Sequence, residues 1–280
     1  MSEQVITSRD NERVRHARSV REGKAEGEIF VEGVRLCEEA ARARLVIKDV
    51  LHTEELSHDG RAARLLSDLK KSGARAAVAS QKVFASLSDT KTPQGIVVIA
   101  ARPPTDASVL EQALKKDSLL VILHQLNNPA NAGAILRTAE AAGAGGIIST
   151  AGTTDLFSAK ALRGAMGSSF RLPVWTGAQF SEALKWCAAR GILTICADVR
   201  AARSHTEFDW TIARALIVGA EASGLSDDEI AQADEALKIP MRPPVESLNV
   251  AVAAAIVLYE AARQRAVGSG QRAVGSKDKA

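Results

Sequence analysis

Cysteine is scarce in this chain of 280 residues. The three cysteines, Cys37, Cys187 and Cys196, form no CxxC or other metal-ligand spacing, and their odd number fits a reducing compartment better than a disulfide framework. The five histidines are scattered, and none pairs with another His or with a Cys at helical spacing. We therefore expect no metal site and no disulfide-stabilised fold.

Long apolar segments are also missing. No window reaches the roughly 18 uninterrupted apolar residues that a membrane-spanning helix needs, and the first residues do not read as a secretory signal. We expect a cytoplasmic protein that does not enter a membrane. The formal net charge of +3 is too small to indicate a nucleic-acid partner by itself, so any such argument depends on where the charges lie.

Several nucleotide-binding and catalytic signatures are absent as well. No GxGxxG follows a strand, and no GxxxxGK[ST] loop is present, which disfavours dehydrogenases and P-loop enzymes. No GxSxG elbow occurs, and His124, His205 and the serines offer no ordered triad for acyl transfer. What remains are loops that follow strands in the second half of the chain.

The first part of the chain begins with a basic leader over residues 1–25. It is expected to be helical, and its arginines favour a solvated helix face and an RNA contact equally: Arg9, Arg13, Arg15, Arg18 and Arg21. From residue 29 short strands alternate with helices up to the run GIVVIAA. Pro103 and Pro104 follow that run and cannot continue a central strand, so we place a domain boundary near residue 105.

The second part reads as an α/β sheet. Apolar runs predict buried strands separated by helical patterns: 119–126, 145–150, 191–199 and 215–221. Such alternation predicts a parallel sheet covered by helices. A long helix is expected over 249–265, and the tail 266–280, in which QRAVGS occurs twice, is expected to be disordered.

The first candidate site segment is NNPANAGAILRTA. Asn131 and Gly133 lie where a strand feeds a helix, and Arg137 lies about one turn into that helix. Ligands bind at the carboxyl ends of strands in open α/β sheets, and the planar guanidinium of arginine suits a phosphate or a carboxylate. The alternative is an arginine that pairs with a surface glutamate.

The second candidate segment is LIVGAEASGLSDDEI. An apolar strand ends at Gly219, a single acid follows at Glu221, and Gly224 precedes a helix whose start is marked by Ser226 and the acids after it. Glycines let the backbone approach a ligand closely. An ordinary strand-loop-helix turn with a solvated glutamate is the alternative.

The third candidate segment is KIPMRPPVESLNVAVAAAI. Ser247 and Asn249 lie where a proline-rich loop enters the last long helix. Simple helix capping would explain both residues. The prolines add a constrained segment that could present its backbone to a planar ring such as adenine.

In this order and spacing, the three segments resemble the signature motifs of the SpoU/TrmH family of RNA ribose methyltransferases, in the SPOUT superfamily. The resemblance covers about 118–265, and ITSRDNERV and IFVEGVRLCEEA look like the family's N-terminal RNA-binding part. It implies a substrate-binding domain over 1–105, a methyltransferase domain over 106–265 with a deep trefoil knot, and a homodimer. The cofactor would be S-adenosylmethionine.

Carried over residue by residue, the resemblance implies two sets of site residues. The set that acts at the ribose or shapes the active site is Arg137, Asn131, Glu221, Ser247 and Asn249. The set that lines the adenine pocket is Gly219, Ile239 and Leu248. Two departures, Asn128 where many members have Asp and Ala222 where Gly is frequent, fall outside the proposed chemistry.

The two-domain layout is similar to that of members acting on 23S ribosomal RNA, with transfer RNA as the other candidate. A noncatalytic RNA-binding protein and an RNA base methyltransferase are the competing interpretations. Four motif residues disfavour both: Arg137, Asn131, Ser247 and Asn249.

Overall fold

The chain forms two compact units in the computed structural model, which describes residues 5–58, 60–88, 90, 92–220 and 224–275. Unit 1 comprises Met1–Pro103 and Asp155–Arg171, and unit 2 comprises Pro104–Thr154 and Leu172–Ala280. The division between the two units falls between Pro103 and Pro104. It also assigns Asp155–Arg171 to unit 1, which the sequence placed in the second domain.

Unit 1 contains a four-stranded mixed sheet in the order β1-β4-β2-β3, in which only β2 and β3 are parallel. Its strands are β1 (Glu28–Glu32), β2 (Ile47–His52), β3 (Arg75–Val78) and β4 (Ile96–Ala101). Its helices are α1 (Glu12–Arg21), α2 (Val34–Arg42), η1 (Glu54–His58), α3 (Gly60–Lys71), α4 (Gln81–Leu87), α7 (Ala159–Ala165) and α8 (Ser168–Arg171). The leader is helical as expected, and β3 and α4, which have four and seven residues and are too short to give a clear period, were missed.

Unit 2 contains a six-stranded sheet in the order β10-β8-β9-β5-β6-β7 with every neighbouring pair parallel, which confirms the expected parallel sheet. Its strands are β5 (Leu119–Leu123), β6 (Gly146–Thr150), β7 (Val174–Ala178), β8 (Leu193–Ala197), β9 (Arg214–Val218) and β10 (Glu235–Leu237). Its helices are α5 (Ala107–Ala113), α6 (Pro129–Ala141), α9 (Phe180–Ala188), η2 (His205–Glu207), α10 (Asp227–Gln232) and α11 (Val250–Gly275). Every residue of β5 and β9 is buried, because strands in the middle of such a sheet are covered on both faces.

Helix α6 begins and ends where the sequence indicates. The Asn128 side chain accepts a hydrogen bond from the backbone N–H of Ala130, and Pro129 occupies the first turn, where its missing N–H costs nothing. The chain leaves the helix at Gly143, whose φ of +80° is in the region that favours glycine. The helix therefore starts at the end of the loop that follows the carboxyl end of β5.

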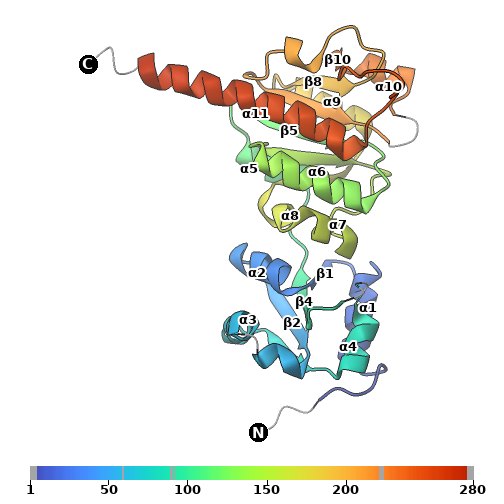
Figure 1. The fold of residues 1–280 in the computed structure, drawn as a ribbon, viewed down its shortest axis with the longest axis vertical. Helices are drawn as coiled ribbons and strands as arrows, with labels where there is room; N and C mark the ends of the chain where they lie inside the picture. Colours follow the sequence, from blue (N-terminus) through green and yellow to red (C-terminus); the bar gives the residue numbers. More distant parts are fainter. Residues whose placement is uncertain (1–4, 59, 89, 91, 221–223, 276–280) are drawn as a thin grey trace. The chain divides into compact units, whose positions relative to one another are not determined.

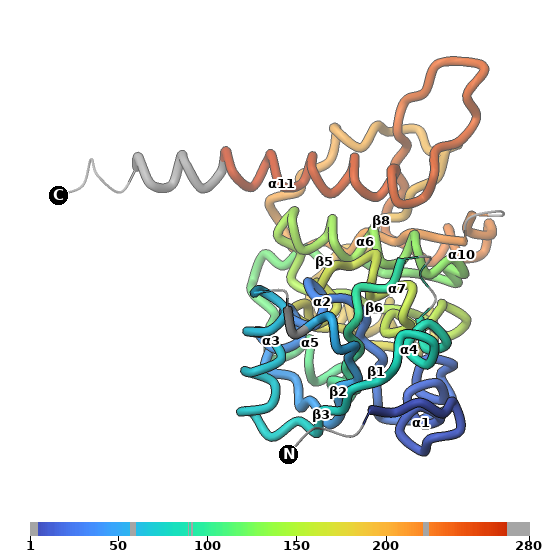
Figure 2. The backbone as a smooth tube through the Cα atoms, turned by 60° about the horizontal axis from the view of Figure 1, so that its bottom comes forward, coloured from blue at the N-terminus to red at the C-terminus, as the bar shows by residue number. Residues whose placement is uncertain are grey.

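Helix α11 lies beside α6 (Figure 1 and Figure 2). Its inner face is apolar and buried through Ala254, Val257, Leu258 and Ala261. The helix continues to Gly275, which differs from the disordered tail expected from residue 266. Because residues 266–275 include three glycines, this part of the helix is explained by continuation of a helix that is already nucleated and not by residue propensity; residues 276–280 lie outside the described part of the chain.

Candidate active site

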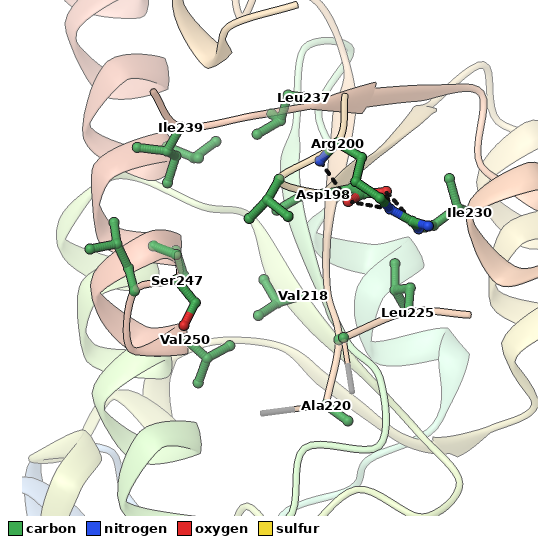
Figure 3. Close-up of a pocket in the computed structure, with 18 of the residues that line it drawn as sticks. Asp198, Arg200, Val218, Ala220, Leu225, Ile230, Leu237, Ile239, Ser247 and Val250 are labelled. Carbon is green, nitrogen blue, oxygen red and sulfur yellow. Dashed lines mark hydrogen bonds and ion pairs between the residues drawn. The ribbon is translucent and has the colours of Figure 1, made fainter. Parts of the chain in front are cut away.

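A cavity of about 610 Å³ lies at the carboxyl edge of the parallel sheet in unit 2. The carboxyl ends of β8, β9 and β10, the start of α10 and the first turns of α11 surround it (Figure 3). This volume is in the range of small-molecule and cofactor sites. Sheets of this kind bind ligands at that edge, because loops with free backbone groups gather there.

The cavity lining combines apolar and charged side chains (Figure 3). Val218, Leu237 and Ile239 give it an apolar wall, on which a flat ring could lie. Asp198 and Arg200, joined by hydrogen bonds, also line it, and the backbone N–H of Asp198 donates to the carbonyl of Leu237. The cavity can therefore hold a ligand that has both an apolar ring and charged or hydroxyl groups.

The three residues predicted for cofactor binding, Gly219, Ile239 and Leu248, all line this cavity. Gly219 follows β9 directly and tolerates no side chain without movement: an added Cβ would lie 2.9 Å from Cγ of Leu225 and 3.1 Å from the carbonyl carbon of Gly224. Glycine is thus required at this position, because two backbone segments approach each other closely at the cavity wall.

The third motif contributes Ser247 and Asn249, and both lie at the start of α11. Ser247 lines the cavity. Asn249 caps the helix, since its Oδ1 accepts hydrogen bonds from the backbone N–H of Ala251 at 2.9 Å and of Val252 at 3.3 Å. The capping interpretation is therefore correct for Asn249, and its side-chain amide nitrogen makes a further hydrogen bond to the first motif.

The first and third motifs meet through their asparagines. Nδ2 of Asn249 donates a hydrogen bond to Oδ1 of Asn131, 3.3 Å away, across 118 positions of sequence. Asn131 lies in the first turn of α6, and α6 packs on α11. The structure thus brings a residue predicted to act at the ribose and one predicted to shape the active site together where the two helices begin.

Arg137 and Glu221 differ in what the structure shows. Arg137 is exposed on α6, and no hydrogen bond or ion pair holds its guanidinium within the part of the chain that is described. The surface glutamate that the alternative interpretation required is therefore not found there. Glu221 lies outside the described residues, although Ala220 and Gly224 on either side of it line the cavity.

An ion-pair network at the cavity wall was not predicted. Arg200 contacts Asp198 at 3.1 Å and Asp227 at 2.8 Å, so it joins the loop after β8 to the start of α10. Burial works to raise the pKa of Asp198, but hydrogen bonds from the side chain and backbone of Arg200 outweigh it and hold that pKa below its usual range. Asp198 is the next-to-last residue of the predicted strand 191–199, and an acid so close to a carboxyl edge was the available signal.

Among the described residues, no cluster of three or more His, Cys, Asp or Glu side chains could hold a metal ion. Within the same ranges, no helix combines the length and apolar character needed to cross a membrane.

Comparison with known proteins agrees with this geometry. Residues 118–259 match the model of the SpoU rRNA Methylase family, and residues 30–105 match that of the RNA 2'-O ribose methyltransferase substrate binding domain. The 23S rRNA (guanosine(2553)-2'-O)-methyltransferase RlmP of Bacillus subtilis is 32% identical over 82% of this chain and 86% of its own. The 23S rRNA (uridine(2479)-2'-O)-methyltransferase of Streptomyces viridochromogenes is 29% identical over 86% of this chain and 85% of its own.

Solved structures agree as well. The SpoU methyltransferase AviRb from Streptomyces viridochromogenes, in complex with AdoMet, superposes with a TM-score of 0.84 at 28% identity, covering 91% of this chain and 98% of that one. The AdoMet-bound rRNA methyltransferase from Sinorhizobium meliloti gives 0.82 at 26%, covering 93% and 97%. A parallel α/β sheet with a cofactor-sized cavity at its carboxyl edge, together with a separate α/β unit, is the architecture of this class of RNA methyltransferases. The chain belongs to the SpoU rRNA methylase family, which confirms the resemblance inferred from its motifs.

Proposed function

We propose that the protein transfers a methyl group from S-adenosylmethionine to a ribose 2′-hydroxyl of 23S ribosomal RNA. The observation that carries this proposal is the convergence of the three motifs on one site. Gly219, Ile239 and Leu248 line a single cavity, and Asn249 beside it is hydrogen-bonded to Asn131. Relatives that match over most of this chain are named as 23S rRNA 2'-O-methyltransferases.

The cavity fits S-adenosylmethionine in charge as well as in size. The charged side chains among the described lining residues are three carboxylates and one guanidinium: Asp198, Asp227, Glu246 and Arg200. This excess of negative charge complements a cation. When bound, the cofactor supplies an electrophilic methyl group on its sulfonium, which the ribose oxygen displaces in line.

The side chains of this protein then align and activate the nucleophile. The Asn131–Asn249 hydrogen bond holds together the starts of α6 and α11, where the ribose would lie. Ser247, two residues before Asn249, lines the cavity. Arg137, which no described residue engages, offers a permanently charged fork suited to an RNA phosphate. Because a guanidinium is a poor base, we assign Arg137 to orienting that phosphate beside the 2′-hydroxyl.

We further propose a homodimer and a knotted methyltransferase domain, as the family resemblance implies, and we place the dimer interface on α11. Val252 and Tyr259 are 49% and 57% exposed, and their seven-residue spacing places them on one face of the helix. Apolar side chains grouped in this way favour a protein partner, and a second copy presents the same face.

We place the protein in the cytoplasm, where its RNA substrate is made.

Methyl transfer to unmodified total RNA tests the function. The protein is incubated with radiolabelled S-adenosylmethionine, and the labelled RNA is fractionated, digested and analysed by mass spectrometry. We expect label on a 2′-O-methylated nucleoside from the large ribosomal RNA. Label on a base, or RNA binding with no label, would contradict the proposal.

A further inference from the structure

His124 is a buried histidine that none of the three motifs includes. It follows β5 directly and is 4% exposed, and its ring lies against Phe180 with centroids 4.3 Å apart. Nε2 is 2.7 Å from Oε1 of Glu229 in α10, and Nδ1 is 2.9 Å from Oγ1 of Thr150 at the end of β6. Both ring nitrogens are thus bonded to groups on other elements.

The position of these partners connects His124 to the cofactor cavity. The backbone N–H of His124 donates to the carbonyl of Val218, which lines the cavity at the end of β9. Its side chain holds Glu229, and the neighbours Ser226 and Ile230 on α10 line the same cavity. One residue therefore contacts both ends of the second motif, the end of β9 and the helix α10.

Glu229 joins two contacts through one carboxylate. Its Oε2 accepts a hydrogen bond from the backbone N–H of Ser226 at 2.8 Å and closes the capping box of α10, while Oε1 contacts His124. Burial works to raise the pKa of Glu229, but these hydrogen bonds outweigh it and keep that pKa below its usual range. The carboxylate stays charged, so the position of α10 is tied to the position of His124.

The hydrogen-bonding pattern is compatible with both forms of the ring. A carboxylate only accepts, so Nε2 carries a hydrogen. The Thr150 hydroxyl either donates to a neutral Nδ1 or accepts from a protonated one, with the carbonyls of Leu123 and Ala151 at 3.5 Å as alternative acceptors. The link to Glu229 is therefore retained in either protonation state of His124.

The chain continues from His124 through Gln125 and Leu126 into the first motif, whose loop leads to Asn131. We propose that His124 is a positioning residue that couples this loop to the cofactor cavity through Glu229, so that a filled cavity and a correctly placed Asn131 favour each other. This inference rests on the proposed function. A histidine that merely satisfied its own polar groups in the core would stabilise the fold without linking the two sites.

Substitution of both partners tests the coupling. We expect His124→Ala and Glu229→Ala each to raise the Kd for S-adenosylmethionine about tenfold, because each leaves a partly buried polar partner unsatisfied. The turnover number at saturating cofactor should fall too, since Asn131 is displaced. The double variant should be little worse than either single variant, because both remove one link. Glu229→Gln keeps an acceptor for Nε2 and a capping residue, so it should restore most of the affinity.

A matched control separates positioning from stability. Arg214 and Glu235 form a largely buried ion pair at the amino end of the same sheet. Glu235→Ala should lower the melting temperature without changing cofactor Kd. Equal effects of Glu235→Ala and Glu229→Ala on that Kd, or no effect of either His124→Ala or Glu229→Ala, would overturn the proposal.

Hydrogen exchange without ligand gives a readout independent of catalysis. Loss of the link should speed amide exchange across residues 126–136 in His124→Ala and Glu229→Ala but not in Glu235→Ala. Unchanged exchange in that segment would reject the coupling even if the enzyme is active. A wild-type protein that binds no cofactor would contradict the proposed function instead, and the exchange experiment would still decide whether His124 holds the two loops together.

Discussion

At the scale of single residues, Arg137 stands apart from the arginines of the leader. Arg137 is exposed and lacks an ion pair within the described part of the chain, whereas Arg13 and Arg21 are engaged inside unit 1. Arg13 contacts the buried Asp49 at 2.6 Å, and Arg21 donates to the carbonyl of Leu87. A guanidinium that no described residue engages is available for substrate, and an engaged one mainly supports the fold.

Replacement of Arg137 by alanine should therefore affect chemistry and not folding. We expect cofactor Kd and melting temperature to stay near the wild-type values while kcat falls at least about a hundredfold, as when a group that acts mainly in the transition state is removed. Steady-state methyl transfer and calorimetry measure both. Arg190→Ala, which removes an arginine engaged with Glu111 and Trp186 in the same unit, is the control. A near-normal rate in Arg137→Ala would remove this residue from the mechanism.

At the scale of elements, helix α11 has two structural roles. Its start carries the third motif, and further along it secures the segment between β8 and β9. Gln264 accepts a hydrogen bond from the backbone N–H of Trp210 and donates to the carbonyl of Phe208, while Glu260 accepts from Gln264 and Arg263. The helix therefore anchors a loop distant in sequence.

This anchor should be sensitive to acid. Hydrogen bonds from the Arg263 side chain, despite an opposing effect of burial, lower the pKa of Glu260 to about 2. Because the folded pKa lies below the unfolded value, the stabilisation is complete above about pH 4.5 and is lost as the pH falls toward 2. We expect Glu260→Gln to lower the melting temperature at pH 6 and to match wild type near pH 2. A difference between the two proteins that did not change across this range would contradict the assignment.

Helix α1 and the residues before it include exposed arginines that could contact RNA. Arg9, just before the helix, and Arg15 on it are exposed. We expect the double change Arg9→Ala and Arg15→Ala to weaken RNA binding. The slope of log K against log salt should become shallower by roughly 0.7 to 0.9 for each RNA phosphate that the protein no longer neutralises.

Filter binding over a salt series measures this slope. Lys70→Ala with Lys71→Ala removes the same charge from α3 of the same unit and is the matched control. Equal weakening in the two double variants would argue against a specific role for the leader.

At the scale of the whole molecule, unit 1 is built from two separate stretches of chain. Glu32 on β1 contacts Arg163 on α7 at 3.5 Å, and Arg102 contacts Asp155 at 2.6 Å. Removal of residues 1–105 would therefore strip Asp155–Arg171 of the residues it packs against. Point substitutions test RNA binding more cleanly than truncation at the boundary that the sequence predicted.

The proposed dimer is also a property of the whole molecule. Tyr259→Arg places a charge on the exposed apolar face of α11, and charge is disfavoured in the core of an interface. We expect a monomer by light scattering in place of a dimer, with circular dichroism unchanged. Exposed Val46 in unit 1 provides a control, since Val46→Arg should leave the mass unchanged. A wild-type monomer, or a Tyr259→Arg dimer, would reject this interface.

Much of the architecture was predictable because it is encoded locally. The strands β5, β6, β8 and β9 and the helix α11 follow from apolar periodicity, and the caps of α6 and α10 follow from Asn128 and Ser226. The strands β7 and β10 were missed, since Thr176 and Gly177 interrupt the apolar run of β7 and β10 has only three residues. The order of the three motifs was enough to identify the family.

The sequence by itself therefore determined the class of fold, the family and the candidate residues of the site, because each depends on neighbours along the chain. Only the tertiary structure decided which of those residues meet. The contact between Asn131 and Asn249 spans 118 positions, and that between His124 and Glu229 spans 105. Such pairs depend on the path of the whole chain through the sheet, and no local pattern records that path. The same reason separates Arg13, engaged with Asp49, from Arg137, which no described residue engages.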